Sequence, residues 1–183
     1  MNWTNTRHGY GLLQILLHWI TVLGIATLIP LGLWMTGLDY YDPWYKKGPD
    51  LHRAIGVMLG ALVILRLCAR LVQARPAPLD GDRLRNRLAG ITHALLYLLP
   101  LLLVTSGYLV STADGRSVDV FGWFSVPATV HGIDGQEDIA GDVHFILAMS
   151  LLAVIAAHAA AALHHHLVLK DATLRRMLKP SQH

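Results

Sequence analysis

The sequence predicts an all-α integral membrane protein, a bundle of four transmembrane helices that forms a single domain over residues 1–183. The chain is 54% hydrophobic and only 15% charged, whereas soluble globular domains are nearer 25% charged. Four apolar runs are each long enough to cross a bilayer, for which about 20 residues are needed. Because the hydrocarbon core offers backbone groups no partner, each run is expected to form a helix.

The four helices are expected at about residues 12–35, 51–71, 88–110 and 141–169. The first run is too long, and too poor in a small-residue cleavage site, to be a removed signal peptide. Pro100 is expected to kink the third helix. The connection over residues 111–140 is long and contains aromatic residues, so an ordered cap or a short helix is expected there.

Charge predicts the orientation of the bundle. Acidic residues dominate the connection over residues 111–140, which carries five Asp or Glu and a single Arg, and Asp142 follows shortly after it. Basic residues instead lie at the end of the second run and after it, at Arg70, Arg75, Arg83, Arg85 and Arg87, and after the fourth run, at Lys170, Arg175, Arg176 and Lys179. Basic loops stay in the cytoplasm, which places both termini there. The net charge of +3 is accounted for by this topology, so no nucleic-acid partner is expected.

Histidines are the unusual feature, with 11 in the chain. His144 and His158 lie 14 residues apart in the last apolar run, which puts both on one helix face, ~21 Å apart along the axis. Ionisable side chains at bilayer depth are costly and usually functional, and imidazole is a common iron ligand. The only cysteine, Cys68, excludes a four-cysteine cluster and covalent C-x-x-C-H haem attachment.

These two histidines each have a partner at a similar depth on another helix, which gives two pairs. His18 lies at a depth comparable to that of His158, toward the cytoplasm, and His52 at that of His144, toward the outside. Two imidazoles at one level of a four-helix bundle are the ligand set of a non-covalent haem. His93 is the runner-up ligand at the inner level. Structural zinc, which needs four clustered ligands, and a proton relay, which needs carboxylates, fit less well.

Glycines, a further histidine and two arginines near these pairs each allow two interpretations. Glycines follow His52 at spacing four, at Gly56 and Gly60, and either leave room for a macrocycle or serve helix packing. His165 either hydrogen-bonds a quinone carbonyl near the inner pair or is an interfacial histidine. Arg53 and Arg66 either contact haem propionates or snorkel to the interface.

Several segments together resemble the bacterial di-haem cytochrome b561 family. They are Leu17-His18-Trp19, Leu51-His52 with its glycines, His93-Ala94-Leu95-Leu96-Tyr97, Val143-His144, the segment from His158 to Leu163, and Lys170-Asp171 with Thr173-Leu174. The resemblance covers essentially the whole chain, and the 14-residue histidine spacing is its most specific part. The long connection over residues 111–140 resembles a distinct branch of the family.

The resemblance implies a multi-pass protein of the bacterial inner membrane with two b haems, ligated by His18 with His158 and by His52 with His144. It also implies ubiquinone as a substrate, and His165 matches a quinone-contacting histidine of a superoxide-oxidising member. Leu12 and Leu16 replace an arginine and a serine of that member, which weighs against superoxide and against the same inner quinone contact.

The functional hypothesis is a quinone-linked oxidoreductase that moves electrons between the quinone pool and a periplasmic donor or acceptor, with superoxide or a periplasmic protein as candidates. The acidic outer connection would repel an anion and favours a cationic or protein partner. The alternative is a haem-bearing membrane anchor subunit of a larger dehydrogenase or hydrogenase. A third reading, a carrier or structural protein whose histidines serve packing or transport, predicts a colourless preparation.

Overall fold

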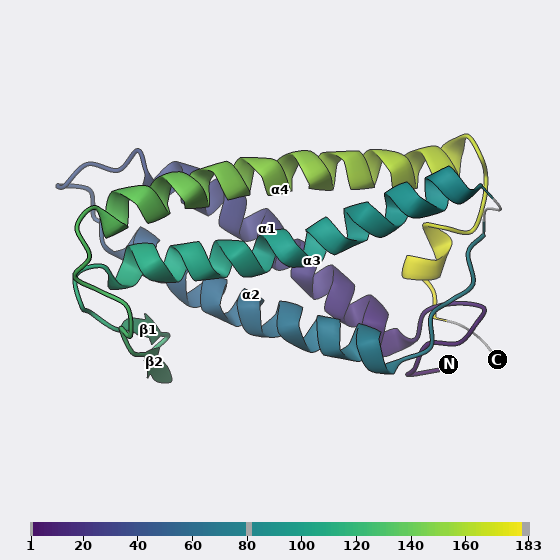
Figure 1. The fold of residues 1–183 in the computed structure, drawn as a ribbon, viewed down its shortest axis with the longest axis horizontal. Helices are drawn as coiled ribbons and strands as arrows, with labels where there is room; N and C mark the ends of the chain where they lie inside the picture. The colour runs from purple at the N-terminus through teal and green to yellow at the C-terminus, as the bar shows by residue number, and fades with distance from the viewer. Residues whose placement is uncertain (1, 80–81, 181–183) are drawn as a thin grey trace.

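The fold is a bundle of four long helices lying side by side (Figure 1), in a computed structural model that describes residues 2–79 and 82–180. The helices are α1 (Leu12–Met35), α2 (Lys47–Val72), α3 (Arg83–Thr112) and α4 (Gln136–Leu167). Within the described residues, these four helices are long and apolar enough to span a membrane. The predicted fold class is therefore confirmed.

Three of the helices begin earlier than the apolar runs predicted. α1 starts where expected, but α2, α3 and α4 begin at Lys47, Arg83 and Gln136 rather than at about residues 51, 88 and 141. The apolar run marks the part of a helix that lies in hydrocarbon, whereas the helix itself continues into polar residues. At α3, for example, the Asp82 carboxylate accepts a hydrogen bond of 2.8 Å from the backbone N–H of Leu84 and caps the extra turn.

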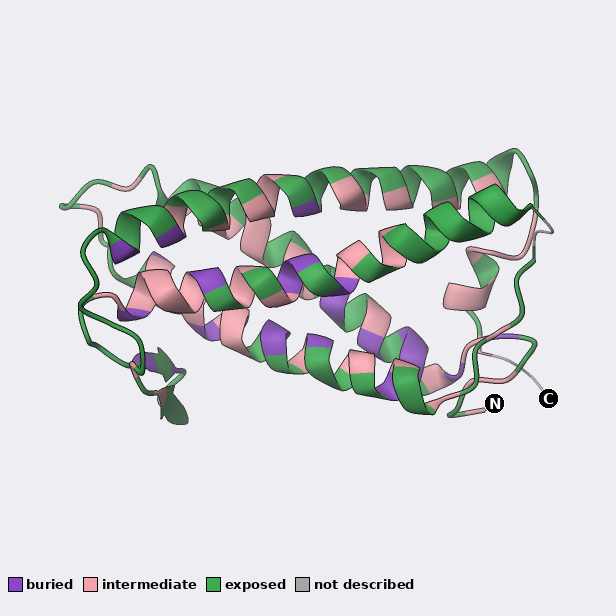
Figure 2. Cartoon of the chain, in the orientation of Figure 1, coloured by how far each residue is buried: buried purple, intermediate pink, exposed green. Residues whose placement is uncertain are grey.

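The helices meet through a small core and leave most of their apolar surface open. α3 packs along α4, α1 along α2, and α2 along α3. Leu59 and Val63 of α2 and Tyr97 of α3 form the buried centre. Of the most apolar window of each helix, only between 6% and 22% is buried within the protein, as the exposed colouring of the helices in Figure 2 shows. These outward faces suit contact with lipid.

The connection between α3 and α4 is ordered, as predicted, but it forms a β-hairpin instead of a short helix. Strand β1 (Val118–Val120) pairs antiparallel with β2 (Phe124–Val126), with Val118 opposite Val126. The sequence Val-Asp-Val alternates apolar and polar residues, which is the strand period. The backbone N–H of Trp123 donates to the carbonyl of Val120 at 3.0 Å, and the two residues between them, Phe121 and Gly122, both have positive φ values, 55° and 71°, as the central residues of a type I′ turn do.

The opposite end of the bundle gathers both ends of the described chain (Figure 1). The Trp19 indole Nε1–H donates at 2.8 Å to the carbonyl of Met177, the last residue of the short 3-10 helix η1 (Arg175–Met177). The backbone N–H of Ala77 donates to the carbonyl of Arg7 at 2.9 Å. The amino-terminal segment, the α2–α3 connection and the carboxy-terminal segment therefore meet at what we call the termini end, and the other end is the hairpin end.

Candidate cofactor sites

The first site lies toward the hairpin end, where His52 of α2 faces His144 of α4. Their ring centroids are 6.2 Å apart and the ring planes are inclined by 72°. An imidazole nitrogen lies about 2 Å from a metal that it ligates, so two rings facing one ion have centroids about 6 Å apart. The structure thus brings together the two residues that depth along the helices had paired, at a spacing that suits one shared metal ion.

A cavity of about 490 Å³ adjoins these two rings, and both histidines line it. Gly56 also lines it, and a Cβ built on Gly56 would meet nothing within 4 Å. A Cβ on Gly60 would instead lie 3.0 Å from the side chain of Val104. The two interpretations of the glycines that follow His52, room for a macrocycle and helix packing, therefore apply to different residues. Gly56 opens into the cavity, and Gly60 allows α2 and α3 to pack closely.

Two further glycines stand behind the imidazoles, and sequence reasoning missed both. A Cβ on Gly32 of α1 would lie 3.0 Å from Cε1 of His52, and a Cβ on Gly107 of α3 would lie 3.1 Å from Cε1 of His144. Each helix therefore approaches a ring so closely that only glycine leaves the ring where it is. In the sequence, each of these glycines lies at the same depth as the histidine that it contacts. Recognising this signal requires knowing which helices are neighbours.

Hydrogen bonding at His144 leaves one ring nitrogen free for a metal. Ser106 Oγ lies 3.0 Å from His144 Nδ1 and 3.1 Å from the carbonyl oxygen of Leu103. If the hydroxyl donates to that carbonyl, it accepts the Nδ1–H of the ring, and the lone pair of Nε2 is left for ligation. Nδ1 of His52 is buried without a hydrogen-bond partner. The side chains and the cavity at this site fit a haem.

The second site lies toward the termini end and contains three histidines rather than two. The rings of His93 on α3 and His158 on α4 have centroids 5.5 Å apart, inclined by 68°. His18 of α1 lies within electrostatic range of both, and its Nδ1 accepts a 2.9 Å hydrogen bond from Nη2 of Arg66. The structure gathers the predicted pair, His18 and His158, with the runner-up His93, and the ring contact it shows is the one with His93.

Arg66 is held in this group by aromatic contact. Its guanidinium carbon lies 5.1 Å from the centre of the Tyr97 ring, and its Nε is buried without a hydrogen-bond partner. Because a guanidinium only donates, its contact with His18 places the ring proton of His18 on Nε2. For His18 to ligate a metal through Nε2, Arg66 must turn to another acceptor, and a carboxylate beside this site would be one.

Arg53 occupies a different setting at the hairpin end. It lines the cavity of the first site, but its Nη2 donates to the carboxylate of Asp50 at 2.5 Å, and its side chain is 37% exposed. Arg116 also lines this cavity and pairs with Asp114. The two arginines at the mouth of the first site thus already have acidic partners.

His165 lies beyond the second site, near the end of α4, and is paired with an acid. Its Nδ1 is 2.5 Å from Oδ2 of Asp171, and Oδ1 of Asp171 accepts the backbone N–H of Thr173 at 2.8 Å. Desolvation alone raises the pKa of Asp171, but the hydrogen bonds from His165 and Thr173 outweigh it and lower that pKa to about 2. The ionised Asp171 therefore holds a proton on Nδ1 of His165 and leaves Nε2 available.

Four membrane helices that present facing imidazoles in their interior are typical of membrane cytochromes that hold haem without covalent attachment. The family described as prokaryotic cytochrome b561 matches this chain over residues 9–180. The chain belongs to the prokaryotic cytochrome b561 family.

Curated relatives agree with this assignment over nearly the full chain. Cytochrome b561 homolog 2 of Escherichia coli (strain K12) is 43% identical over 182 residues, which cover 99% of this chain and 97% of the relative. A probable superoxide oxidase, CybB, of Yersinia pestis is 31% identical over 175 residues, covering 92% and 95%. Cytochrome b562 of Cereibacter sphaeroides is 32% identical over 180 residues, covering 94% and 96%.

Membership and the four candidate spans define the protein's setting. It is a multi-pass protein of a bacterial inner membrane, surrounded by lipid, that takes part in electron transfer and binds haem b. The predicted family, fold class and localisation are confirmed. The number of haems, their ligands and the redox partners stay predictions.

Proposed function

We propose that this protein carries two b haems, one held by His52 and His144 and the other by His18 and His158, and moves electrons across the membrane between ubiquinone and a periplasmic donor or acceptor. The observation that carries the proposal is the facing of His52 and His144 at 6.2 Å beside a cavity of about 490 Å³. A haem b held by two histidines would supply one-electron transfer rather than oxygen activation.

At the first site, neighbouring residues of the protein support the rings of both proposed ligands. Gly32 and Gly107 allow α1 and α3 to press against the two rings, and Ser106 orients the ring of His144. Gly56 keeps the adjoining space open. Ligands with supported orientations hold a metal more tightly than mobile ones, so we infer that this is the better-formed of the two sites.

At the second site, Arg66 connects the proposed ligand His18 with the negative charge that a haem propionate would bring. It donates to His18 while its Nε has no partner. A haem propionate within reach would accept from Arg66 and release Nδ1 of His18, which could then carry the ring proton and free Nε2. The proposed propionate contact of Arg66 and ligation by His18 therefore depend on each other. For Arg53, which is paired with Asp50, the same role would require exchange of partners.

We place the quinone contact at His165. It lies seven residues beyond His158 on α4, about 10 Å along the helix axis, and its Nε2 is left free by the contact with Asp171. An imidazole nitrogen that carries or accepts a proton suits a quinone, because reduction to quinol consumes protons as well as electrons. Asp171 acts through His165 and is a positioning residue.

For orientation, we place the termini end in the cytoplasm and the hairpin end outside. The basic connection around Arg75 and the basic carboxy-terminal segment lie at the termini end, and the acidic connection lies at the other. At the outer site, hydrogen bonds from Arg116 lower the pKa of Asp114, so this pair stays charged and internally matched. With its arginines paired in this way, the outer end favours a cationic or protein donor over superoxide.

The quinone proposal is tested by mixing the oxidised protein in lipid nanodiscs with a short-chain ubiquinol and following haem reduction by absorption. We expect His165→Ala to slow haem reduction at least tenfold and Asp171→Asn to slow it at least threefold. Neither variant should lose haem. Asp171→Glu should recover most of the rate. His166→Ala, an adjacent histidine change on α4, is the matched control and should leave the rate unchanged. Equal rates for His165→Ala and wild type would rule out this quinone contact.

A further inference from the structure

The hairpin presents an aromatic surface that the electron-transfer function does not use. Its tip, which we define as residues 121–124, reads Phe-Gly-Trp-Phe. Phe121, Trp123 and Phe124 are 46%, 73% and 48% exposed, whereas Val118 and Val120 of β1 are 4% and 0% exposed. The hairpin therefore docks on the bundle through its valines and turns its aromatic side chains outward.

The position of the hairpin indicates what this surface faces. In Figure 1 the hairpin lies beside the first turns of α2 and projects sideways from the bundle rather than beyond the helix ends. β1 packs on α2, and residues of α2 and of the hairpin, including Leu51, Ala54 and the turn residue Phe121, line a pocket of about 420 Å³. Because the four helices run along the membrane normal, a sideways projection at this level extends along the membrane surface.

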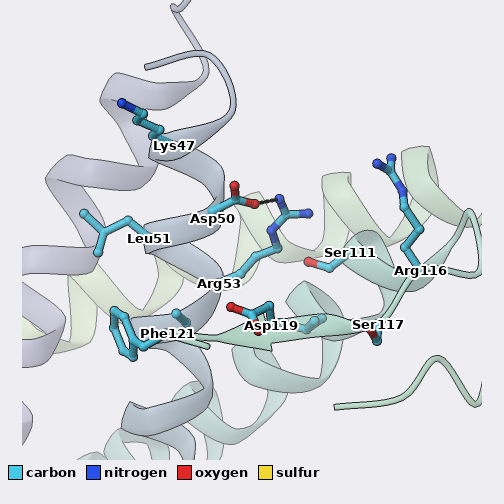
Figure 3. A pocket seen from close by; sticks show the side chains of 11 residues that line it. Lys47, Asp50, Leu51, Arg53, Ser111, Arg116, Ser117, Asp119 and Phe121 are labelled. Atoms are coloured by element: carbon cyan, nitrogen blue, oxygen red, sulfur yellow. Dashed lines mark hydrogen bonds and ion pairs between the residues drawn. The ribbon is translucent and has the colours of Figure 1, made fainter. Parts of the chain in front are cut away.

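Phe121 continues a face of α2 that is exposed to lipid. Leu51, Met58 and Leu65 recur at spacing seven on α2 and are 36%, 40% and 55% exposed in the isolated protein. Figure 3 shows Phe121 on the same side of α2 as Leu51, away from Arg116. A phenylalanine placed at the end of an apolar, outward-facing stripe on a membrane helix lies where hydrocarbon gives way to headgroups.

The height of the tip is fixed by the segments on either side of it. The Tyr108 hydroxyl of α3 donates to the carbonyl of Pro127 at 2.7 Å and accepts the backbone N–H of Thr129 at 2.7 Å. The Thr112 hydroxyl lies 3.1 Å from the carbonyl of Val130. Within the turn, Asp119 accepts the backbone N–H of Gly122 at 2.9 Å. The segment that follows β2 is thus tied to α3, and the tip is held at a set depth.

We propose that the hairpin tip inserts Phe121, Trp123 and Phe124 into the headgroup region of the bilayer at this end of the bundle, and so anchors the α3–α4 connection to the membrane surface. Trp is the residue most suited to this boundary, since its ring is apolar and its N–H reaches water and headgroups. Lys47, on the first turn of α2, lines the same pocket together with Asp50 and Asp119, and its exposed side chain is long enough to reach headgroup phosphates. The proposal does not depend on the haem count or on the electron donor.

The chain's single cysteine makes this testable by site-specific labelling. Cys68 is exposed on α2, so Cys68→Ala provides a cysteine-free background in which Trp123→Cys is labelled with a bimane fluorophore. Asp134→Cys, at an exposed position in the same connection, is the matched control. Both proteins are placed in nanodiscs of phosphatidylethanolamine and phosphatidylglycerol, with or without lipids brominated near the headgroup end of their chains.

We expect brominated lipid to quench the label at residue 123 at least threefold more than the label at residue 134, and aqueous iodide to show the opposite order. Phe124→Cys is a second probe of the tip and should behave as residue 123 does. The proposal would be overturned if iodide quenched the labels at residues 123 and 124 as strongly as the label at residue 134, and if brominated lipid quenched neither tip label. That outcome would leave the aromatic tip facing water, as a surface for a protein partner.

Discussion

Replacing Gly56 with leucine is expected to remove the haem at the outer site and leave the inner one. Gly56 lines the cavity beside His52 and His144, and a Cβ at this position would meet nothing within 4 Å. A leucine side chain would extend from α2 into that open space, where we place the macrocycle. The haem content should fall from two per chain to one.

Loss of haem through the added side chain can be distinguished from loss of haem through damage to the fold. Glycine in a helix interior is about 0.8–1 kcal/mol less favourable than alanine, and leucine is close to alanine, so the substitution strengthens α2 itself. Gly90→Leu is the matched control, because Gly90 also lies within a helix, α3, with nothing within 4 Å of an added Cβ, and is not part of the cavity lining. This control should retain both haems.

The assay is a pyridine haemochrome measurement on protein purified in mild detergent, divided by the chain concentration from amino-acid analysis. A circular dichroism spectrum with unchanged helix content accompanies each variant. If Gly56→Leu retained two haems per chain, the cavity beside Gly56 would not be the haem site, and the spacing of His52 and His144 would need another explanation.

The remaining predictions concern ligand choice, ring position and pH. His18→Ala should retain one haem and His93→Ala both, as measured by haemochrome content, and the reverse order would make His93 the inner ligand. Gly107→Ala places a Cβ 3.1 Å from Cε1 of His144 and should speed haem loss to apomyoglobin severalfold, whereas Gly90→Ala should not change the rate. Asp171, whose folded pKa of about 2 lies below the unfolded value near 3.9, stabilises the protein above about pH 4 and loses this effect as pH falls toward 2. Asp171→Asn should therefore melt at a lower temperature than wild type at pH 6, with a gap that narrows on acidification, and a gap independent of pH would contradict the assignment.

The outer pair could be predicted from the sequence because depth in a membrane helix follows residue number. At about 1.5 Å per residue, His52 and His144 had to reach the same level once the spans were placed. The inner level was harder, since three helices each bring a histidine there. Which ring meets His158 depends on the rotation and neighbours of α1 and α3, and the structure shows His93 in ring contact while His18 binds Arg66.

Contacts between elements were beyond the sequence for the same reason. Gly32 and Gly107 matter because their helices press against His52 and His144, and nothing local in the sequence marks a glycine for that role. The hairpin was missed because its strands are three residues each, too short for a periodic pattern to stand out within an aromatic-rich connection. The partnership of His165 with Asp171 depends on how the chain turns after α4.

The number of b haems per chain in the purified protein tests the central claim most directly. A dithionite-reduced minus oxidised spectrum shows whether the pigment is a b-type haem, and the haemochrome assay gives the number per chain. We expect two for wild type and one for His52→Ala. A single haem in wild type would contradict the two-site account, and a colourless protein would contradict any role of the paired histidines as haem ligands.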